Sequence, residues 1–563
     1  MKRFAQLYAE LDASTATSAK VDALKRYFAH AASADAAWAV YFLAGGKPRQ
    51  VVPTATLRAL ACRCAGIADW LFEECYQAVG DLAETIAHVL PAAASVSDVG
   101  LADWITLRLL PLRAAEPAEQ AQRIGAYWDE LDAPGRYLLT KLIGGGFRVG
   151  VSKLLVQRAL AESAALDAKL VAQRMMGYTD AKAAPDAQRY EALIAAPSTE
   201  TAQGGQPYPF FLAHAIDAPP AEFDARLGSP SDWLVEWKYD GIRAQVVRRA
   251  DQVWIWSRGE ELMTERFPEI VALAQSLPQG TVLDGEVLVW RAGEDQAAPF
   301  KLLQQRIGRK TLGKKILADA PVVFVAYDLL ESDGQDRRDE PQHKRRERLE
   351  AMLQGTPLRL SPLVQAADWP ALAALRAESR QRGVEGFMLK QRESRYGSGR
   401  TKADGTWWKW KIEPLSVDCV LIYAQAGHGR RASVYTDYTF AVWSRAPVSQ
   451  EEAQAVVEAI ARREPAREGA LQLVAFAKAY SGLSDEEFAG VDRVIRAHTL
   501  EKFGPVRSVK PTLVFELGFE AINASARHKS GIAVRFPRML RVRDDKPLWQ
   551  ADSLETLRAL MEV

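Results

Sequence analysis

A lysine stands between two carboxylates on one face of a predicted strand. In the segment Glu236-Trp-Lys-Tyr-Asp-Gly-Ile-Arg243 the side chains alternate, so Glu236, Lys238 and Asp240 point to one side and the apolar residues to the other. A glycine and Arg243 follow where the strand runs into a turn. Such a face can offer a lysine nucleophile, an acceptor for a nucleotide base and a cation for phosphates.

Two further segments put charge on one side of a predicted strand and apolar bulk on the other. Asp284 and Glu286 share one such face. Lys409 and Lys411 share another, opposite tryptophans. A half-solvated sheet with its charges outward explains each strand alone. If the three faces line one cleft, that cleft holds the lysines and carboxylates that phosphate chemistry with a divalent metal requires.

The composition is that of an ordinary globular chain. Its 563 residues are too many for one core, and 48% of them are hydrophobic. The net charge of +1 gives no sign of nucleic-acid binding, although a local basic surface can still bind a nucleic acid. Four cysteines without a C-x-x-C pair argue against a zinc site or a disulfide framework and fit a reducing, cytoplasmic location. The N-terminus lacks an apolar signal region, and no apolar run is long enough to cross a membrane.

The patterning divides the chain into three regions. Residues 1–200 carry apolar side chains at helical spacing and predict an all-α domain. A stretch rich in Pro, Ser, Thr and Gly predicts a linker, and residues 206–412 then mix strands with helices in an α+β domain. Residues 413–563 alternate as short strands, interrupted by helical stretches near residues 450–463 and 485–498, which predicts a small β-barrel.

Seven short motifs occur in one order along the chain. They are Lys238-Tyr-Asp-Gly-Ile-Arg243, Ser257-Arg-Gly, Asp284-Gly-Glu286, Tyr327-Asp328, Glu385-Gly-Phe-Met-Leu-Lys390, Lys409-Trp-Lys411 and Val534-Arg-Phe-Pro-Arg-Met-Leu-Arg-Val-Arg543-Asp-Asp-Lys546. This ordered set resembles the covalent nucleotidyltransferase superfamily, and within it the ATP-dependent DNA ligases of the bacterial stand-alone, three-domain type. A lone K-x-D-G motif carries little information, so the resemblance rests on the whole set.

The resemblance implies a fold and an activity. The fold is a helical DNA-binding domain, an α+β nucleotidyltransferase (ATP-grasp-like) core and a C-terminal OB-fold barrel. The activity is ATP-dependent sealing of 5′-phosphate/3′-hydroxyl nicks in duplex DNA by a monomer. RNA ligases and messenger-RNA capping enzymes share the catalytic motifs and are the alternative. A non-catalytic DNA scaffold with a decayed site is a third hypothesis.

The resemblance also implies a role for each motif residue. Lys238 attacks the α-phosphorus of ATP and carries AMP as a phosphoramidate, while Glu286 and Glu385 place Mg²⁺. The residues expected to bind the nucleotide are Glu236 on the adenine amino group, Tyr327 stacked on the ring, Arg243, Arg258 and Arg400 on ribose or phosphate oxygens, Glu286 through the metal, Lys390, Lys409 and Lys411 on the α-phosphate, and Arg543 and Lys546 on the pyrophosphate. Tyr327 stands where the family more often has Phe, and it keeps the π-face that stacking needs.

Five residues are expected to contact DNA. Arg148 and Lys153 lie in a Gly-rich segment of the helical region, where backbone N–H groups can approach phosphates. Phe300, Arg535 and Phe536 resemble positions that press aromatic side chains into the minor groove beside the nick. A Gly-rich turn between packed helices and a phenylalanine in the core are the structural alternatives.

Overall fold

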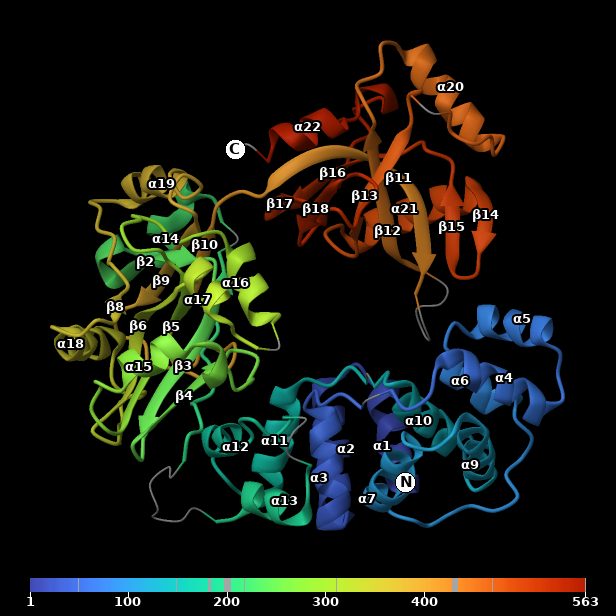
Figure 1. Ribbon diagram of the computed structural model, residues 1–563, viewed down its shortest axis with the longest axis horizontal. Helices are drawn as coiled ribbons and strands as arrows, with labels where there is room; N and C mark the ends of the chain where they lie inside the picture. The colour runs from blue at the N-terminus through green and yellow to red at the C-terminus, as the bar shows by residue number, and fades with distance from the viewer. Residues whose placement is uncertain are drawn as a thin grey trace. The chain divides into compact units, whose positions relative to one another are not determined.

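Figure 1 shows the ribbon of the computed structural model, whose internal contacts group the residues into two compact units. The described residues are 1–48, 50–147, 149–180, 184–196, 204–216, 218–309, 311–427, 434–467 and 469–561. The first unit contains Met1–Val51, Ser97–Ala115 and Lys141–Ile412, and the second contains Val52–Val96, Glu116–Thr140 and Glu413–Val563. The boundaries of the three predicted domains stay a prediction.

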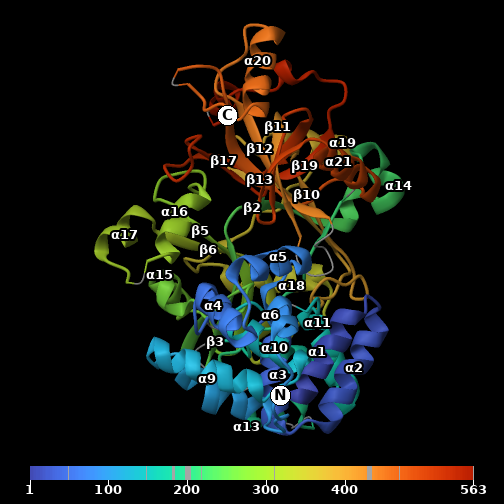
Figure 2. The same cartoon turned by 90° about the vertical axis from the view of Figure 1, so that its right-hand side faces the viewer.

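The described residues before 197 form helices and connecting turns, which confirms the predicted all-α region. In the first unit these helices are α1 (Lys2–Ala13), α2 (Thr17–His30), α3 (Ser33–Leu43), α7 (Leu101–Asp103), the π-helical turn η1 (Trp104–Leu109), α8 (Leu110–Leu112), α11 (Lys153–Ala164), α12 (Ala168–Arg174) and α13 (Ala187–Ile194). Helix α2 packs against both α1 and α11 (Figure 2), and each contributes an apolar stripe that is buried at helical spacing.

Two sheets form the α+β part of the first unit. One has the strand order β1-β10-β9-β2, and the other has the order β4-β3-β5-β6-β7 with β8 beside β6. The strands are β1 (His214–Ala215), β2 (Trp233–Tyr239), β3 (Ile242–Arg249), β4 (Gln252–Ser257), β5 (Thr281–Val289), β6 (Val322–Ser332), β7 (Gln335–Asp336), β8 (Arg359–Leu360), β9 (Val384–Gln391) and β10 (Trp407–Lys411). The helices are η2 (Pro220–Glu222), α14 (Phe223–Leu227), η3 (Pro230–Asp232), η4 (Thr264–Arg266), α15 (Pro268–Ala274), α16 (Phe300–Ile307), α17 (Lys314–Asp319), α18 (Gln342–Leu353) and α19 (Trp369–Ala377).

The chain crosses from one sheet to the other between β2 and β3. Only Asp240 and Gly241 separate the two strands, so the K-x-D-G-x-R motif straddles the junction of the sheets. Strands β5 and β9, which carry the D-G-E and E-G motifs, pair with β3 and β2 respectively. The topology therefore gathers motifs that are far apart in the sequence around one junction.

The glycines of these motifs allow close approach of neighbouring backbones. A Cβ at Gly241 would lie 2.5 Å from the carbonyl oxygen of Val287. At Gly386, where φ is +120°, it would lie 2.2 Å from the carbonyl oxygen of Trp410. Side chains do not fit at such distances, and L-residues rarely adopt that φ. Glycine at both positions is thus a condition for bringing the strands together.

Apolar residues on the opposite faces of the same strands build the core. Leu283 and Val287 of β5 are buried in a cluster with residues of β3, β4, β6, α15 and α18. Trp410 of β10 is buried in a second cluster with Phe387 of β9 and Trp369 of α19. Burial of these faces fixes the register, because a shift by one residue would turn the charged faces inward.

The second unit combines helices with a C-terminal sheet, consistent with the expected OB-fold. Its strands are β11 (Leu415–Ala426), β12 (Tyr435–Trp443), β13 (Leu473–Ala479), β14 (Thr499–Phe503), β15 (Val506–Val509), β16 (Val514–Phe519), β17 (Ala521–Ala524), β18 (Ile532–Arg535) and β19 (Arg538–Val542). Strand β11 pairs with β12, β15 and β16 and carries register shifts, as a strand that bends between the sides of a barrel does. Helices α20 (Gln450–Ala461) and α21 (Asp485–Ala497) lie where helices were predicted, and η6 (Leu548–Gln550) and α22 (Leu554–Ala559) follow the last strand.

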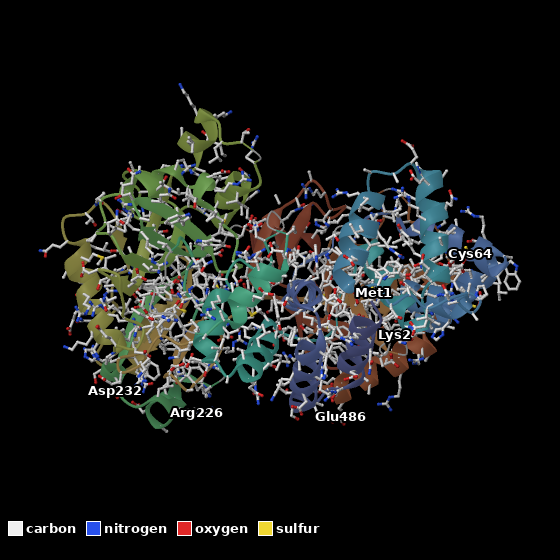
Figure 3. The ribbon with its side chains drawn as sticks, turned by 90° about the horizontal axis from the view of Figure 1, so that it is seen from below. Met1, Lys2, Cys64, Arg226, Asp232 and Glu486 are labelled. Carbon is white, nitrogen blue, oxygen red and sulfur yellow. The ribbon has the colours of Figure 1, made fainter. Side chains whose placement is uncertain are left out.

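The helices α4 (Thr54–Ala65), α5 (Asp69–Val79), α6 (Leu82–Val89) and α9 (Pro117–Asp129) also belong to the second unit, while α10 (Ala133–Gly144) spans the boundary. None of the described helices combines the length and the hydropathy that a membrane crossing needs. All four cysteines are free; Cys64 of α4 is exposed (Figure 3), and Cys419 of β11 is buried.

Candidate active site

Lys238 lies near the end of β2 beside a carboxylate from β9. Its ammonium forms an ion pair with Glu385, and Nζ of Lys411 on β10 is 3.5 Å from the same carboxylate. The side chains of Lys238 and Glu385 expose 23% and 17% of their area. The pair of Lys238 and Glu385 is therefore largely shielded from solvent, yet a substrate can still reach it. The structure brings together three residues that the sequence singled out on three separate strands.

Glu286 of β5 faces the same group. Burial raises the pKa of Glu286 to about 8, although the charges of Lys238 and Arg243 oppose that rise. The carboxylates of Asp284 and Glu385 add to it, because like charges close together disfavour ionisation. A carboxyl with so raised a pKa is a candidate for a functional site.

Glu286 and Glu385 form a donor pair that suits Mg²⁺. Among the described residues, no cluster of three or more His, Cys, Asp or Glu side chains could hold a metal. Mg²⁺ does not need such a cluster, because it keeps several waters and takes other oxygens from substrate phosphates beside one or two protein carboxylates. The raised pKa of Glu286 reflects an unfavourable negative charge, which a cation would relieve.

A second group of charges lies around Glu236, also on β2. One of its carboxylate oxygens is 2.9 Å from Nη1 of Arg346 on α18, and the other forms an ion pair with Lys390 on β9. The Lys390 ammonium lies 4.1 Å from the ring centroid of Tyr327 and 4.7 Å from that of Trp407. The residues predicted to read the base and to neutralise the α-phosphate are thus in direct contact.

The guanidinium of Arg243 is held by the protein on several sides. It lies 2.7 Å from Asp284, donates to the carbonyl oxygen of Phe211 at 2.6 Å, and is 3.3 Å from the hydroxyl of Tyr396. Burial alone would lower the pKa of Arg243, but the Asp284 carboxylate overcomes that effect and raises it. Arg243 thus connects β3 to Asp284 of β5 and to the segments that carry Phe211 and Tyr396. Its contact with ribose or phosphate stays a prediction.

Three further residues of the first unit are predicted to bind the nucleotide. Arg258 and Arg400 are exposed. Lys409 lies half-buried on β10, paired across the sheet with Met388. Their roles stay predictions.

Arg543 and Lys546 belong to the second unit, where both contact one buried aspartate. Asp418 of β11 is 3.0 Å from Arg543 and 2.6 Å from Lys546. Arg543 also donates hydrogen bonds to Asp545 that lower the pKa of that carboxyl to about 2. Asp418 therefore holds the two predicted pyrophosphate ligands side by side.

Comparisons with known proteins decide the family. Residues 211–411 match the model described as "ATP dependent DNA ligase domain", and residues 1–161 match "DNA ligase N terminus". A "Probable DNA ligase" of Koribacter versatilis is 31% identical over 516 residues, which cover 87% of this chain and 83% of that protein. The chain belongs to the ATP-dependent DNA ligases. A "DNA ligase" of Natronomonas pharaonis is 30% identical over 81% of this ligase and 77% of its own length.

One solved structure shows that the fold extends over nearly the whole ligase. The structure named "Pmar-Lig_PreS3" matches with a TM-score of 0.57 and covers 96% of this chain and 99% of its own, at 14% identity. At that identity the likeness concerns the fold alone. It agrees with the helical, α+β and β-rich regions that the sequence predicted.

The predicted DNA contacts of the ligase have mixed surroundings. Arg148 lies outside the described residues. Lys153 forms an ion pair with Glu260 and donates to the carbonyl oxygen of Met175 at 3.2 Å, and burial lowers its pKa. Phe300 is half-buried against the core, as the structural alternative describes. All of these contacts with DNA stay predictions.

The segment around Phe536 looks different. Phe536 is 64% exposed, and the Arg535 guanidinium lies 5.1 Å from the centroid of its ring. The φ of Phe536 is +52°, a value that costs energy for any residue except glycine. An exposed aromatic side chain on a strained backbone is typical of a contact site rather than of a core position.

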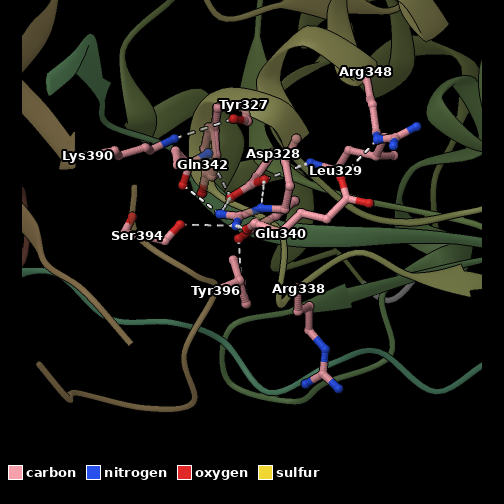
Figure 4. Close-up of polar contacts among 12 residues, drawn as sticks. Tyr327, Asp328, Leu329, Arg338, Glu340, Gln342, Arg348, Lys390, Ser394 and Tyr396 are labelled. Atoms are coloured by element: carbon pink, nitrogen blue, oxygen red, sulfur yellow. Dashed lines mark hydrogen bonds and ion pairs between the residues drawn. The ribbon is translucent and has the colours of Figure 1, made fainter. Parts of the chain in front are cut away.

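Several residues of the ligase site were missed by sequence reasoning. Arg346 neutralises Glu236, and Tyr396 donates to Asp284 at 2.6 Å. Arg345 of α18 forms a fully buried pair with Asp328, at 2.8 Å, and Gln342 also donates to Asp328 (Figure 4). Asp328 directly follows Tyr327, so this pair fixes the backbone that carries the ring predicted to stack on adenine. The adjacent arginines Arg345 and Arg346 are the only signal in the sequence, and they name no partner.

Arg345→Met is expected to destabilise the first unit by about 3–5 kcal/mol, because it leaves the Asp328 carboxylate buried without a counter-ion. Urea unfolding followed by circular dichroism measures this loss. Arg348→Met is the matched control on the same helix, since Arg348 is 49% exposed and its pair with Glu340 is worth about 0–1 kcal/mol. Equal losses in the two variants would contradict the role given to Arg345.

Proposed function

We propose that this ATP-dependent DNA ligase seals nicks through an adenylate carried on Lys238. The observation that carries the proposal is the pairing of Lys238 with Glu385, next to Glu286 and Lys411. A nucleophile, two carboxylates and a further cation thus meet beside the group around Glu236 and Tyr327. A non-catalytic scaffold has no need of such an arrangement.

The first step charges the enzyme. The Lys238 nitrogen attacks the α-phosphorus of ATP, a P–N bond forms, the P–O bond to the β-phosphate breaks, and pyrophosphate leaves with the electron pair. The ammonium must lose a proton first, because its lone pair is the nucleophile. Glu286 and Glu385 are the residues that would hold Mg²⁺, which when bound supplies positive charge to phosphate oxygens and competes with Lys238 for Glu385.

The next two steps move AMP to DNA and off again. The 5′-phosphate at the nick attacks the adenylate, a P–O–P linkage forms, and the Lys238 amine is recovered. The 3′-hydroxyl then attacks the 5′-phosphorus and expels AMP, which leaves a phosphodiester. Each step is an in-line displacement, so positioning and charge neutralisation dominate. Lys390, Lys409 and Lys411 would neutralise charge on the α-phosphate, and Arg243, Arg258 and Arg400 would hold ribose or phosphate oxygens.

Arg543 and Lys546 would orient the leaving pyrophosphate in the first step alone. Asp418→Asn is expected to slow charging by ATP roughly 10- to 100-fold, because the two cations lose the carboxylate that fixes them. Sealing of a nick that already carries the 5′-adenylate should change much less. Single-turnover rates of the two reactions measure the split. Asp545→Asn is the control, since Asp545 is a 64% exposed partner of Arg543, and an equal effect there would contradict the assignment.

Nicked duplex DNA is the substrate that the proposal commits to. The test compares sealing of a singly nicked DNA duplex with sealing of a nicked RNA duplex. Each substrate is incubated with ATP, with NAD⁺ and without nucleotide. The proposal expects ATP-dependent sealing of DNA, and preference for the RNA nick would favour the RNA-ligase alternative. We also propose a monomer with a cytoplasmic location. Sedimentation at working concentration tests the first, and cell fractionation tests the second.

A further inference from the structure

Glu236 is a buried carboxylate held between two cations of different character. Only 3% of its side chain is exposed, and Arg346 and Lys390 expose 6% and 2%. The three come from β2, α18 and β9. Two buried cations thus share one buried carboxylate, while the second carboxylate on Arg346, that of Glu350, is 47% exposed.

Arg346 is anchored. Its Nη1 donates to Glu236 at 2.9 Å, its Nη2 donates to the carbonyl oxygen of Ser361 at 2.7 Å, and its Nε donates to Glu350 at 2.6 Å. Three acceptors from different segments use the fork of donors that a guanidinium presents. Arg346 therefore stays on Glu236.

Lys390 is held differently. Beyond its ion pair with Glu236, it reaches the carbonyl oxygen of Tyr327 only at 3.5 Å, and it otherwise faces the rings of Tyr327 and Trp407. A lysine ammonium is a point charge on a flexible stem, so it can leave such contacts by rotation of its side chain.

Lys390 occupies both of the surfaces that an adenine base needs. Its Nζ lies 4.1 Å from the centroid of the Tyr327 ring and forms an ion pair with a carboxylate oxygen of Glu236. We propose that adenine displaces Lys390 from Glu236 and from the Tyr327 ring, and that the displaced ammonium moves to the α-phosphate. This inference rests on the proposed function, and it makes base recognition and phosphate neutralisation one coupled event.

The coupling has a consequence for specificity. The adenine amino group donates a hydrogen bond to Glu236 and can replace the ammonium, whereas a base with a carbonyl at the same position cannot donate. With such a base Lys390 stays on Glu236 and the α-phosphate lacks its cation. Discrimination against inosine and guanosine triphosphates should therefore appear in the rate of charging and not only in binding.

Lys390→Met is expected to bind adenosine roughly 5- to 10-fold more tightly than wild type, because nothing has to be displaced from Glu236. The same variant should be charged by ATP more slowly, because the α-phosphate has lost a cation. The opposite signs are diagnostic, since a lysine that served phosphate alone would leave adenosine affinity unchanged. Isothermal titration with adenosine and single-turnover charging with ATP measure the two effects.

Two further variants sharpen the test. Lys411→Met removes another predicted phosphate cation, one that pairs with Glu385 rather than Glu236, and should slow charging without changing adenosine affinity. Lys390→Arg, in which a fork of donors holds Glu236 more firmly, should weaken adenosine binding, and it carries the test if the Met variant does not fold.

The possible failures are distinguishable. If wild type binds adenosine and is charged by ATP, but Lys390→Met binds adenosine no more tightly and Lys390→Arg no more weakly, the exchange is wrong and the proposed function stands. If wild type is not charged by ATP at all, the proposed function fails and the exchange falls with it.

Discussion

Lys238→Ala is expected to lose charging by ATP by at least about 10⁴-fold, because the variant has no amine to form the P–N bond. It should nevertheless seal a nick that already carries the 5′-adenylate, since the last step uses no lysine nucleophile. Radiolabel from α-labelled ATP retained on the protein measures the first reaction, and a pre-adenylated nicked duplex measures the second.

Lys344→Ala is the matched control for Lys238. Lys344 is a 56% exposed lysine of α18 that pairs with Glu347 on the same helix, so its loss should leave both reactions unchanged. Retention of label by Lys238→Ala at the wild-type level would show that another residue carries AMP. Loss of both reactions together would point to misfolding, which the thermal melting curve of the variant decides.

Glu385→Gln is expected to reduce charging by roughly 10²- to 10³-fold. Glu385 touches Lys238 and Lys411 and is one of the two carboxylates assigned to Mg²⁺. The amide keeps the size of the side chain and removes its charge, so the loss of charging rate measures the electrostatic contribution of the carboxylate. The concentration of Mg²⁺ needed for half-maximal charging should rise in the variant. Glu294→Gln, on an exposed carboxylate that pairs with Arg291, should change neither quantity. An unchanged metal requirement in Glu385→Gln would remove this residue from the metal site.

Glu286 adds a pH dependence with a defined sign. The pKa of Glu286 is about 8 in the folded protein, whereas the ordinary value for a glutamate, which we take for the unfolded chain, is 4.5. Folding therefore favours the protonated carboxyl, and without added metal the stability that this group contributes falls as the pH rises from about 4.5 through about 8. Glu286→Gln cannot ionise, so it should exceed wild type in the free energy of unfolding at pH 8–9 and equal it below pH 4.5. Urea unfolding across this range checks the prediction, and a parallel pH profile in both proteins would contradict it.

Alternation along strands was enough to predict which side chains share a face. It placed Asp284 and Glu286 on the charged side of β5 and Leu283 and Val287 in the core, as the structure has them. The helices α20 and α21 and the change from helices to strands also followed from spacing. The recognition of the family came from the ordered set of motifs, and the comparisons confirm the family.

What the sequence did not show depends on packing between distant segments. Helix α18 packs against β6, and only this packing lets Arg346 reach Glu236 of β2, 110 positions earlier in the chain. Lys153 is turned toward Glu260, and nothing in its Gly-rich surroundings predicts that pairing. Phe300 follows a proline and could equally begin a core helix or a contact loop; the structure has it at the start of α16, half-buried against the core, and its contact with DNA stays a prediction.

The most direct test of the account is mass spectrometry of the ligase after incubation with ATP and Mg²⁺. The account predicts an AMP adduct on the peptide that contains Lys238, which acid removes because a P–N bond is acid-labile, and which disappears when nicked DNA is added. An adduct on any other peptide, or active sealing with no adduct at Lys238, would contradict it.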